Sequence, residues 1–141
     1  MAKDNNQGTI LLVEDDTFLA GMYKTKFEME GFTIITAEDG LKGFQLAKEK
    51  KPDIILLDIL LPKMDGFEVL EKVRASKDTK DIPVIMLTNL GQKEDVKKGL
   101  ERGANGYLIK AHFMPSEVVE KVKMVLKNSG QPVAEDQADL K

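Results

Sequence analysis

The 141-residue sequence contains no cysteine and no tryptophan, and its single histidine is His112. Without cysteine there are no disulfide bonds, thiol nucleophiles, zinc knuckles or iron–sulfur ligands. A lone histidine leaves no histidine cluster for zinc, and we expect His112 to have a loop or surface role rather than to transfer protons. The absence of cysteine is consistent with a reducing compartment.

Long hydrophobic runs are also missing. The longest apolar stretch, residues 54–61, is interrupted by Asp58 and is far shorter than the roughly 20 residues that a membrane-spanning helix needs. The first residues contain no apolar segment typical of a signal peptide. We therefore expect a cytoplasmic protein that has no membrane partner.

An excess of positive charge is absent as well. The chain has 21 Lys and Arg residues and 24 Asp and Glu residues, which gives a formal net charge of −3. Proteins that bind nucleic acids without sequence preference are usually basic, so this balance argues against direct DNA binding. Apolar and charged residues make up 42% and 32% of the chain, as in soluble globular domains, and the length fits one domain.

Five short runs rich in valine, isoleucine and leucine recur along the chain. They cover residues 9–13, 32–36, 54–58, 83–87 and 106–109. Several of these runs are continuously apolar rather than alternating, which is typical of strands that are covered on both faces. This pattern favours a parallel sheet.

Segments with helical spacing lie between these runs. In the first, the apolar positions 18, 19, 22, 23, 27 and 29 form a broad stripe, and the later segments centre on residues 41–47, 67–73, 96–104 and 118–126. Ser116 is a candidate N-cap for the last helix. Five β–α units predict an α/β three-layer sandwich with a five-stranded parallel sheet and five helices. The flavodoxin-like strand order 2-1-3-4-5 is the natural expectation.

Acidic residues follow the first strand directly, as Glu14, Asp15 and Asp16. In open parallel α/β sheets, binding sites form beyond the carboxyl ends of the strands. We expect Asp16 to cap the following helix. Adjacent carboxylates repel one another, so a hard cation such as Mg²⁺ would relieve the repulsion. The alternative is that all three are helix caps and solvated charges.

Asp58 stands at the end of the third strand among apolar neighbours. Aspartate is rarely buried without a partner, so it either accepts hydrogen bonds from loop N–H groups or acts as a metal ligand or carboxylate nucleophile. Thr88 and Lys110 directly follow the fourth and fifth apolar runs, where each alone is typical of a loop or surface residue. Together with Glu14 and Asp15, these three residues would suit the binding of a phosphoryl group with Mg²⁺.

Four segments of the sequence resemble the receiver domain of two-component response regulators, in particular the stand-alone, chemotaxis-type members. They are residues 10–16, 53–66, 83–88 and 103–110. Each motif alone has low specificity, but the four occur in order and each reaches a predicted strand end. The resemblance implies a receiver domain over residues 8–127, with flexible termini at 1–7 and 128–141.

The resemblance implies a role for each matching residue of the metal site. Asp58 would accept a phosphoryl group from the phosphohistidine of a sensor histidine kinase or a histidine phosphotransfer protein. Asp15 and Asp58 would bind Mg²⁺ directly, Glu14 would bind it through water, and the Leu60 backbone carbonyl would be a further ligand. Asp65 is expected to cap the third helix rather than to contact metal.

The resemblance also implies a switch. Thr88 would hydrogen-bond a phosphoryl oxygen, Lys110 would pair with it, and Tyr107 corresponds to an aromatic residue that turns inward on activation. The simpler interpretation of Tyr107 is a half-buried strand aromatic. We expect a phosphoacceptor rather than an enzyme, a downstream protein target, a monomer or weak dimer, no output domain and no direct DNA binding.

Two positions depart from the pattern of the family. Ala111 follows Lys110 where proline is usual, often after a cis bond. Because a cis bond before alanine costs about 3 kcal/mol, we expect a trans bond and a loop that runs differently. Asn89 follows Thr88 where a small residue is usual. The position two residues after Asp58 is the apolar Leu60, which would exclude water.

Two other functions stay open at this stage. A pseudo-receiver that acts only by docking is favoured by Ala111 and Asn89, whereas the intact acidic residues and Thr88 argue against it. A Mg²⁺-dependent phosphohydrolase with an aspartate nucleophile, of the haloacid dehalogenase type, typically has a second aspartate where this chain has Leu60.

Overall fold

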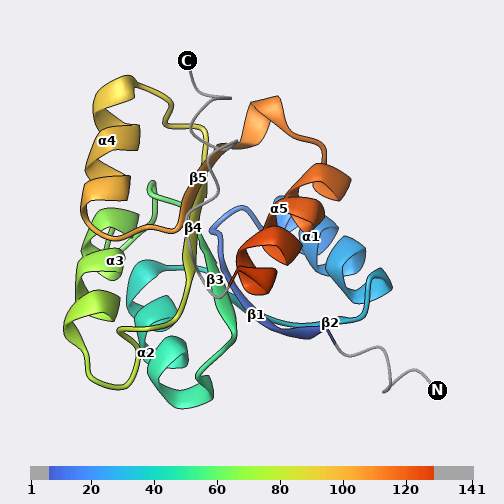
Figure 1. Ribbon diagram of the computed structural model, residues 1–141, viewed down its shortest axis with the longest axis horizontal. Coiled ribbons are helices and arrows are strands. Elements are labelled where there is room, and N and C mark those ends of the chain that lie inside the picture. The colour runs from blue at the N-terminus through green and yellow to red at the C-terminus, as the bar shows by residue number, and fades with distance from the viewer. Residues whose placement is uncertain (1–6, 129–141) are drawn as a thin grey trace.

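Strands and helices alternate along the computed structural model, which describes residues 7–128 (Figure 1). The strands are β1 (Gly8–Val13), β2 (Phe32–Ala37), β3 (Ile54–Leu57), β4 (Val84–Thr88) and β5 (Gly106–Ile109). The helices are α1 (Thr17–Met29), α2 (Gly40–Lys50), α3 (Gly66–Ala75), α4 (Lys93–Glu101) and α5 (Pro115–Lys127), with a short 3₁₀ helix, η2 (Lys110–His112), after β5. None of the helices within residues 7–128 is long and apolar enough to cross a membrane.

The sheet is parallel and has the strand order β2-β1-β3-β4-β5, which confirms the expected flavodoxin-like fold. In the register of the central strands, Val13 lies opposite Leu57. The Asp58 N–H donates to the Val13 carbonyl at 3.1 Å. Glu14 and Asp58 therefore leave the sheet next to each other, although they are far apart in the sequence.

Helices cover both faces of the sheet. Helices α1 and α5 lie on one face, and α2, α3 and α4 lie on the other (Figure 1). In β1, Ile10 and Leu12 belong to the core under α1 and α5, whereas Leu11 and Val13 belong to the core under α2 and α3. Both sets of side chains are buried, which explains why the strand reads as a continuous apolar run.

The helix starts confirm two expected caps and correct a third. The Asp16 carboxylate accepts from Phe18 and Leu19 N–H groups at the start of α1, and Asp65 caps α3 by accepting from Glu68 N–H. The expectation for Ser116 is wrong, because α5 begins at Pro115 and Met114 is its N-cap. Proline suits the first helical position, since it has no N–H to leave unpaired.

Other boundaries and the α1 stripe also differ from expectation. Asp58 lies one residue beyond β3, and Thr88 is the last residue of β4 rather than the residue after it. In α1, Tyr23 and Phe27 are buried, but Phe18 and Met29 are 79% and 75% exposed. The core side of α1 packs on β2 and α5 and covers only part of the stripe; the apolar residues at the helix ends lie outside it.

Candidate functional site

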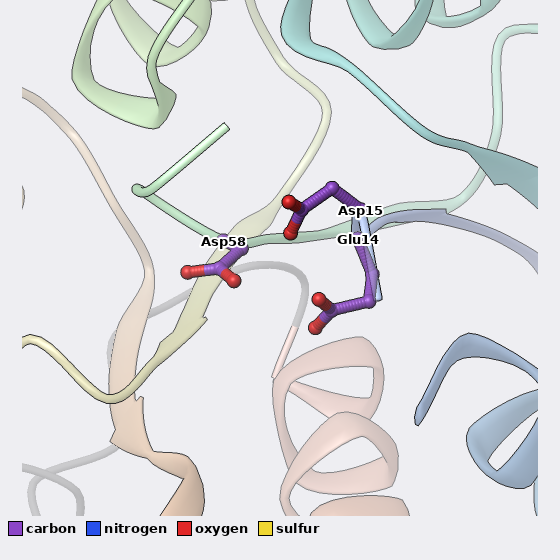
Figure 2. Close-up of side chains that lie close together, drawn as sticks. All are labelled: Glu14, Asp15 and Asp58. Carbon is purple, nitrogen blue, oxygen red and sulfur yellow. The ribbon is translucent and has the colours of Figure 1, made fainter. Parts of the chain in front are cut away.

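Three carboxylates gather at the carboxyl edge of the sheet. Glu14 and Asp15 follow β1, and Asp58 follows β3. Each offers an oxygen within 4.8 Å of the oxygens of the other two. Figure 2 shows the carboxylates of Glu14 and Asp15 extending from the end of β1 toward the side where Asp58 lies. The oxygen-rich donor set and this spacing fit a hard divalent cation such as Mg²⁺.

Lys110 brings the single amine of the cluster. Its Nζ donates to Asp58 Oδ2 at 2.8 Å and also to Glu14 Oε1. The Lys110 side chain is 9% exposed, and the Glu14 side chain is 2% exposed. One ammonium group is therefore shared between two buried carboxylates, and the exposed Asp15 adds a third negative charge. The cluster is left with excess negative charge.

Burial and hydrogen bonding act in opposite directions on these groups. Burial raises the pKa of the Glu14 carboxyl, although the hydrogen bonds from Lys110 and from Asp16 N–H partly offset this. Burial alone would lower the pKa of Lys110, but its hydrogen bonds to Asp58 and Glu14 and the negative charges of these two groups together raise the pKa above its usual value. Lys110 is therefore a cation at neutral pH.

The second oxygen of Asp58 is held by the main chain. Asp58 Oδ1 accepts from Ile59 N–H at 2.7 Å and from Leu60 N–H at 3.4 Å. The loop that supplies these donors folds back on itself at Gly66, whose N–H donates to the Ile59 carbonyl. A Cβ at Gly66 would lie 2.2 Å from the Asp58 carbonyl oxygen. Glycine is required here by close backbone approach.

Thr88 and Tyr107 are linked through one residue of the loop after β4. Thr88 is fully buried, and its Oγ1 accepts from Leu90 N–H at 3.3 Å. The Tyr107 hydroxyl donates to the Leu90 carbonyl. Tyr107 is 1% exposed rather than half-buried, because Gly99 of α4 leaves room beside its ring. Burial raises the pKa of the Tyr107 phenol well above its usual value.

The positions that depart from the family pattern lie at the rim of the site. The Lys110–Ala111 bond is trans, as expected, and residues 7–128 contain no cis peptide bond. Leu60, two residues after Asp58, is 61% exposed. His112 lies in η2 on the surface, in agreement with the expected loop role.

Sequence reasoning missed Tyr23 as a neighbour of the site. Its pKa is raised by burial, and its phenol is close enough to be influenced by the charges of Lys110, Glu14 and Asp58. The only signal in the sequence was its place in the apolar stripe of α1. The backbone N–H donors of Ile59 and Leu60 also had no sequence signal, since every non-proline residue has one.

The fold and the site together define a class: a doubly wound parallel α/β domain with an acidic cluster and a lysine at the carboxyl edge of the sheet. The model of the response regulator receiver domain matches residues 10–123. The chain belongs to this family, whose members are phosphoacceptor domains of two-component systems.

Known proteins support the assignment. The chain is 41% identical over 120 residues to the DNA-binding dual master transcriptional regulator RpaA of Synechocystis, which covers 85% of this chain and 49% of RpaA. A CheY-like receiver domain protein from Methanospirillum hungatei is 30% identical, with a TM-score of 0.80 over 86% of this chain and 94% of that one. The receiver domain of the sensor histidine kinase PA1611 from Pseudomonas aeruginosa, solved with magnesium coordinated in its active-site cleft, is 28% identical. Its TM-score is 0.78 over 85% of this chain and 98% of that one.

The relatives leave part of the expected function open. The chain spans about half the length of the curated relatives it matches, at 46–52% for the second and third of them. RpaA is a DNA-binding regulator. The expectations of no output domain and no direct DNA binding therefore stay predictions.

Proposed function

We propose that Asp58 accepts a phosphoryl group from the phosphohistidine of a sensor histidine kinase or a histidine phosphotransfer protein, in a reaction that requires Mg²⁺. The observation that carries this proposal is the placement of Asp58. Its carboxylate lies next to the oxygens of Glu14 and Asp15 and is bonded to Lys110. An aspartate in such a setting combines a nucleophilic oxygen with adjacent charges of both signs.

The residues of the chain would divide the chemistry between them. An oxygen of Asp58 forms the new O–P bond while the N–P bond of the donor breaks, and the electron pair of that bond stays on the imidazole nitrogen. The Ile59 N–H on Asp58 Oδ1 orients the carboxylate for this approach. The Lys110 amine, now shared by Asp58 and Glu14, would meet the oxygens of the arriving group.

Asp15, Asp58 and Glu14 would hold Mg²⁺, Glu14 through water, with the Leu60 carbonyl as a further ligand. The chemistry that Mg²⁺ supplies when bound is neutralisation of charge on the transferring phosphoryl group. The excess of negative charge in the cluster supports this assignment, because two buried carboxylates share one amine.

Phosphorylation would be transmitted through Leu90. Thr88 Oγ1 now accepts from Leu90 N–H, and rotation of the Thr88 side chain toward a phosphoryl oxygen would move Oγ1 away from this donor. The Leu90 carbonyl in turn holds the Tyr107 hydroxyl. Movement at Thr88 would therefore change the packing of Tyr107 against α4 and shift the population of two conformations of that surface. A downstream protein would bind the altered surface.

The test is phosphorylation by a small donor. The protein is incubated with Mg²⁺ and acetyl phosphate, and its intact mass is measured. We expect one added phosphoryl group, which is lost in Asp58→Asn and in a metal-free sample. Asp53→Asn is the matched control, because Asp53 lies before the opposite end of β3 and its carboxylate accepts from Thr9 N–H.

The other outcomes separate the competing functions. Absence of an adduct, together with phosphate release no faster than from Asp58→Asn, would contradict the proposal and favour a docking-only pseudo-receiver. Sustained release of phosphate from many donor molecules, including ordinary phosphomonoesters, would instead favour a phosphohydrolase.

A further inference from the structure

Asn89 and Ala111, the two positions noted above at the rim of the site, are bonded to each other. The Asn89 side-chain oxygen accepts a hydrogen bond from the Ala111 backbone N–H at 3.2 Å. A proline at 111 would have no N–H to donate, and an alanine at 89 would have no acceptor. The bond therefore requires an acceptor side chain at position 89 and a residue other than proline at position 111, and this chain has both.

The bond between Asn89 and Ala111 lies just beyond the end of the pairing between β4 and β5. Main-chain pairing of β4 with β5 ends where Thr88 lies opposite Ile109. Beyond that pair, β4 turns away toward α4 and η2 begins at Lys110. The Asn89 side-chain amide resembles a peptide group, so its bond to Ala111 continues the connection after the main chains separate. Lys110 is held on one side by the Ile109 pairing and on the other by Asn89.

We propose that Asn89 is a positioning residue that fixes the backbone at Lys110, so that the amine reaches Asp58 and Glu14. The lysine side chain is long and has many rotamers, so the position of its amine depends on how well its backbone is fixed. The amine bonds Asp58 at 2.8 Å while its side chain is 9% exposed, and a backbone shift of about one ångström would break such an alignment. At the end of η2, the hydrogen bond from the Phe113 N–H to the Lys110 carbonyl is long, at 3.3 Å.

The inference rests on the proposed phosphorylation of Asp58, and its test has one readout that depends on that function and one that does not. The first is the phosphorylation rate at saturating acetyl phosphate. We expect Asn89→Ala to slow it about fivefold, the rate equivalent of one ordinary hydrogen bond. Ala111→Pro should slow it at least as much, because proline also disfavours the helical backbone of the residue before it.

The double variant identifies the bond itself. Since one bond can be lost only once, Asn89→Ala combined with Ala111→Pro should be about as slow as Ala111→Pro alone. The matched control is Gln92→Ala, which removes an exposed amide side chain from the same loop that makes no cap hydrogen bond. The control should be phosphorylated at the rate of the wild-type protein. Multiplicative effects of the two single substitutions would overturn the proposal.

The second readout is the reactivity of the Lys110 amine toward reductive methylation, measured by peptide mass spectrometry in metal-free protein. Lys110 should react slowly in the wild-type protein and in Gln92→Ala. It should react about fivefold faster in Asn89→Ala, in line with the loss of one hydrogen bond. Unchanged reactivity in Asn89→Ala would overturn the positioning role. If the unmodified protein takes up no phosphoryl group, the proposed function fails, and the Lys110 reactivity alone decides whether Asn89 positions it.

Discussion

The two edges of the sheet carry polar clusters of opposite character. Before the amino ends of β4 and β5, the Arg74 guanidinium donates to the carbonyls of Lys80, Ile82 and Gly103 and to Asn105 Oδ1, over 2.7–3.1 Å. These bonds use all of the N–H groups that a guanidinium has. The acceptors are neutral oxygens, and Asp81 is close enough for its charge to influence the pKa of Arg74, so the cluster needs no further group.

The cluster at the carboxyl edge, in contrast, has more carboxylates than amines. Glu14 and Asp58 share the one amine of Lys110, and Asp15 lies beside them. Charges of the same sign that are held together raise the free energy of the folded protein unless a cation joins them. A polar cluster whose hydrogen bonds are all made stabilises the fold, whereas a cluster with surplus negative charge retains the capacity to bind a cation.

The largest effect is expected from Gly66→Ala at the carboxyl edge. The new Cβ would lie 2.2 Å from the Asp58 carbonyl oxygen and 2.6 Å from Ile59 Cα, and both belong to backbone that holds the site. We expect a loss of about 4 kcal/mol in the free energy of unfolding, measured with urea. The matched control is Gly21→Ala in α1, where a Cβ would meet nothing within 4 Å. It should stabilise the protein by about 0.5 kcal/mol. Equal effects of both substitutions would contradict the close approach at Gly66.

Arg74→Ala tests the amino edge. It should lower the free energy of unfolding by about 3 kcal/mol, because several carbonyl groups and the Asn105 side chain lose their donor together. Lys72→Ala on the exposed side of the same helix should change stability by less than about 0.5 kcal/mol. A large change in Mg²⁺ affinity in Arg74→Ala would contradict the independence of the two edges.

The sequence predicted the carboxyl edge far better than the amino edge. The carboxyl ends of parallel strands lie at the same edge of the sheet, so carboxylates that directly follow apolar runs could be assigned to one site. Glu14, Asp15 and Asp58 do lie together. The acceptors of Arg74 are mostly backbone carbonyls, which every residue has, so no pattern of side chains predicts them.

Other features depended on packing that periodicity does not encode. The full burial of Tyr107 requires the space beside Gly99, a residue of another element. The exposure of Phe18 depends on how much of α1 its neighbours cover. Asn89 could be recognised as unusual, but its contact with Ala111 depends on where two loops separate.

Mg²⁺ should neutralise the surplus negative charge at the carboxyl edge and leave the amino edge unaffected. At about 100 times its Kd, it should raise the free energy of unfolding by about 2.7 kcal/mol, because it binds the folded protein and not the unfolded chain. Arg74→Ala should show the same increment from its lower baseline, since the edges share no polar contact among those described. Asp15→Asn should show a smaller increment, and chelation should reverse the gain. An undiminished response in a double variant that lacks both Asp15 and Asp58 would place the metal elsewhere.

The smallest effect concerns the amine that competes with the metal. Lys110→Met removes the one positive charge from the cluster but keeps an apolar chain of similar length. The Lys110 amine now bonds Asp58 and Glu14, and its charge repels any cation held by them. We therefore expect Mg²⁺ to bind about tenfold more tightly, which corresponds to about 1.4 kcal/mol. Because burial raises the pKa of Glu14 and loss of Lys110 would raise it further, the calorimetric titration should be made at about pH 8, where a larger fraction of Glu14 is ionised than at neutral pH. The gain should shrink as the pH falls, since proton binding to Glu14 then competes with the metal. Unchanged affinity at about pH 8 would mean that the Lys110 charge does not oppose metal binding, and would contradict competition between the amine and the metal.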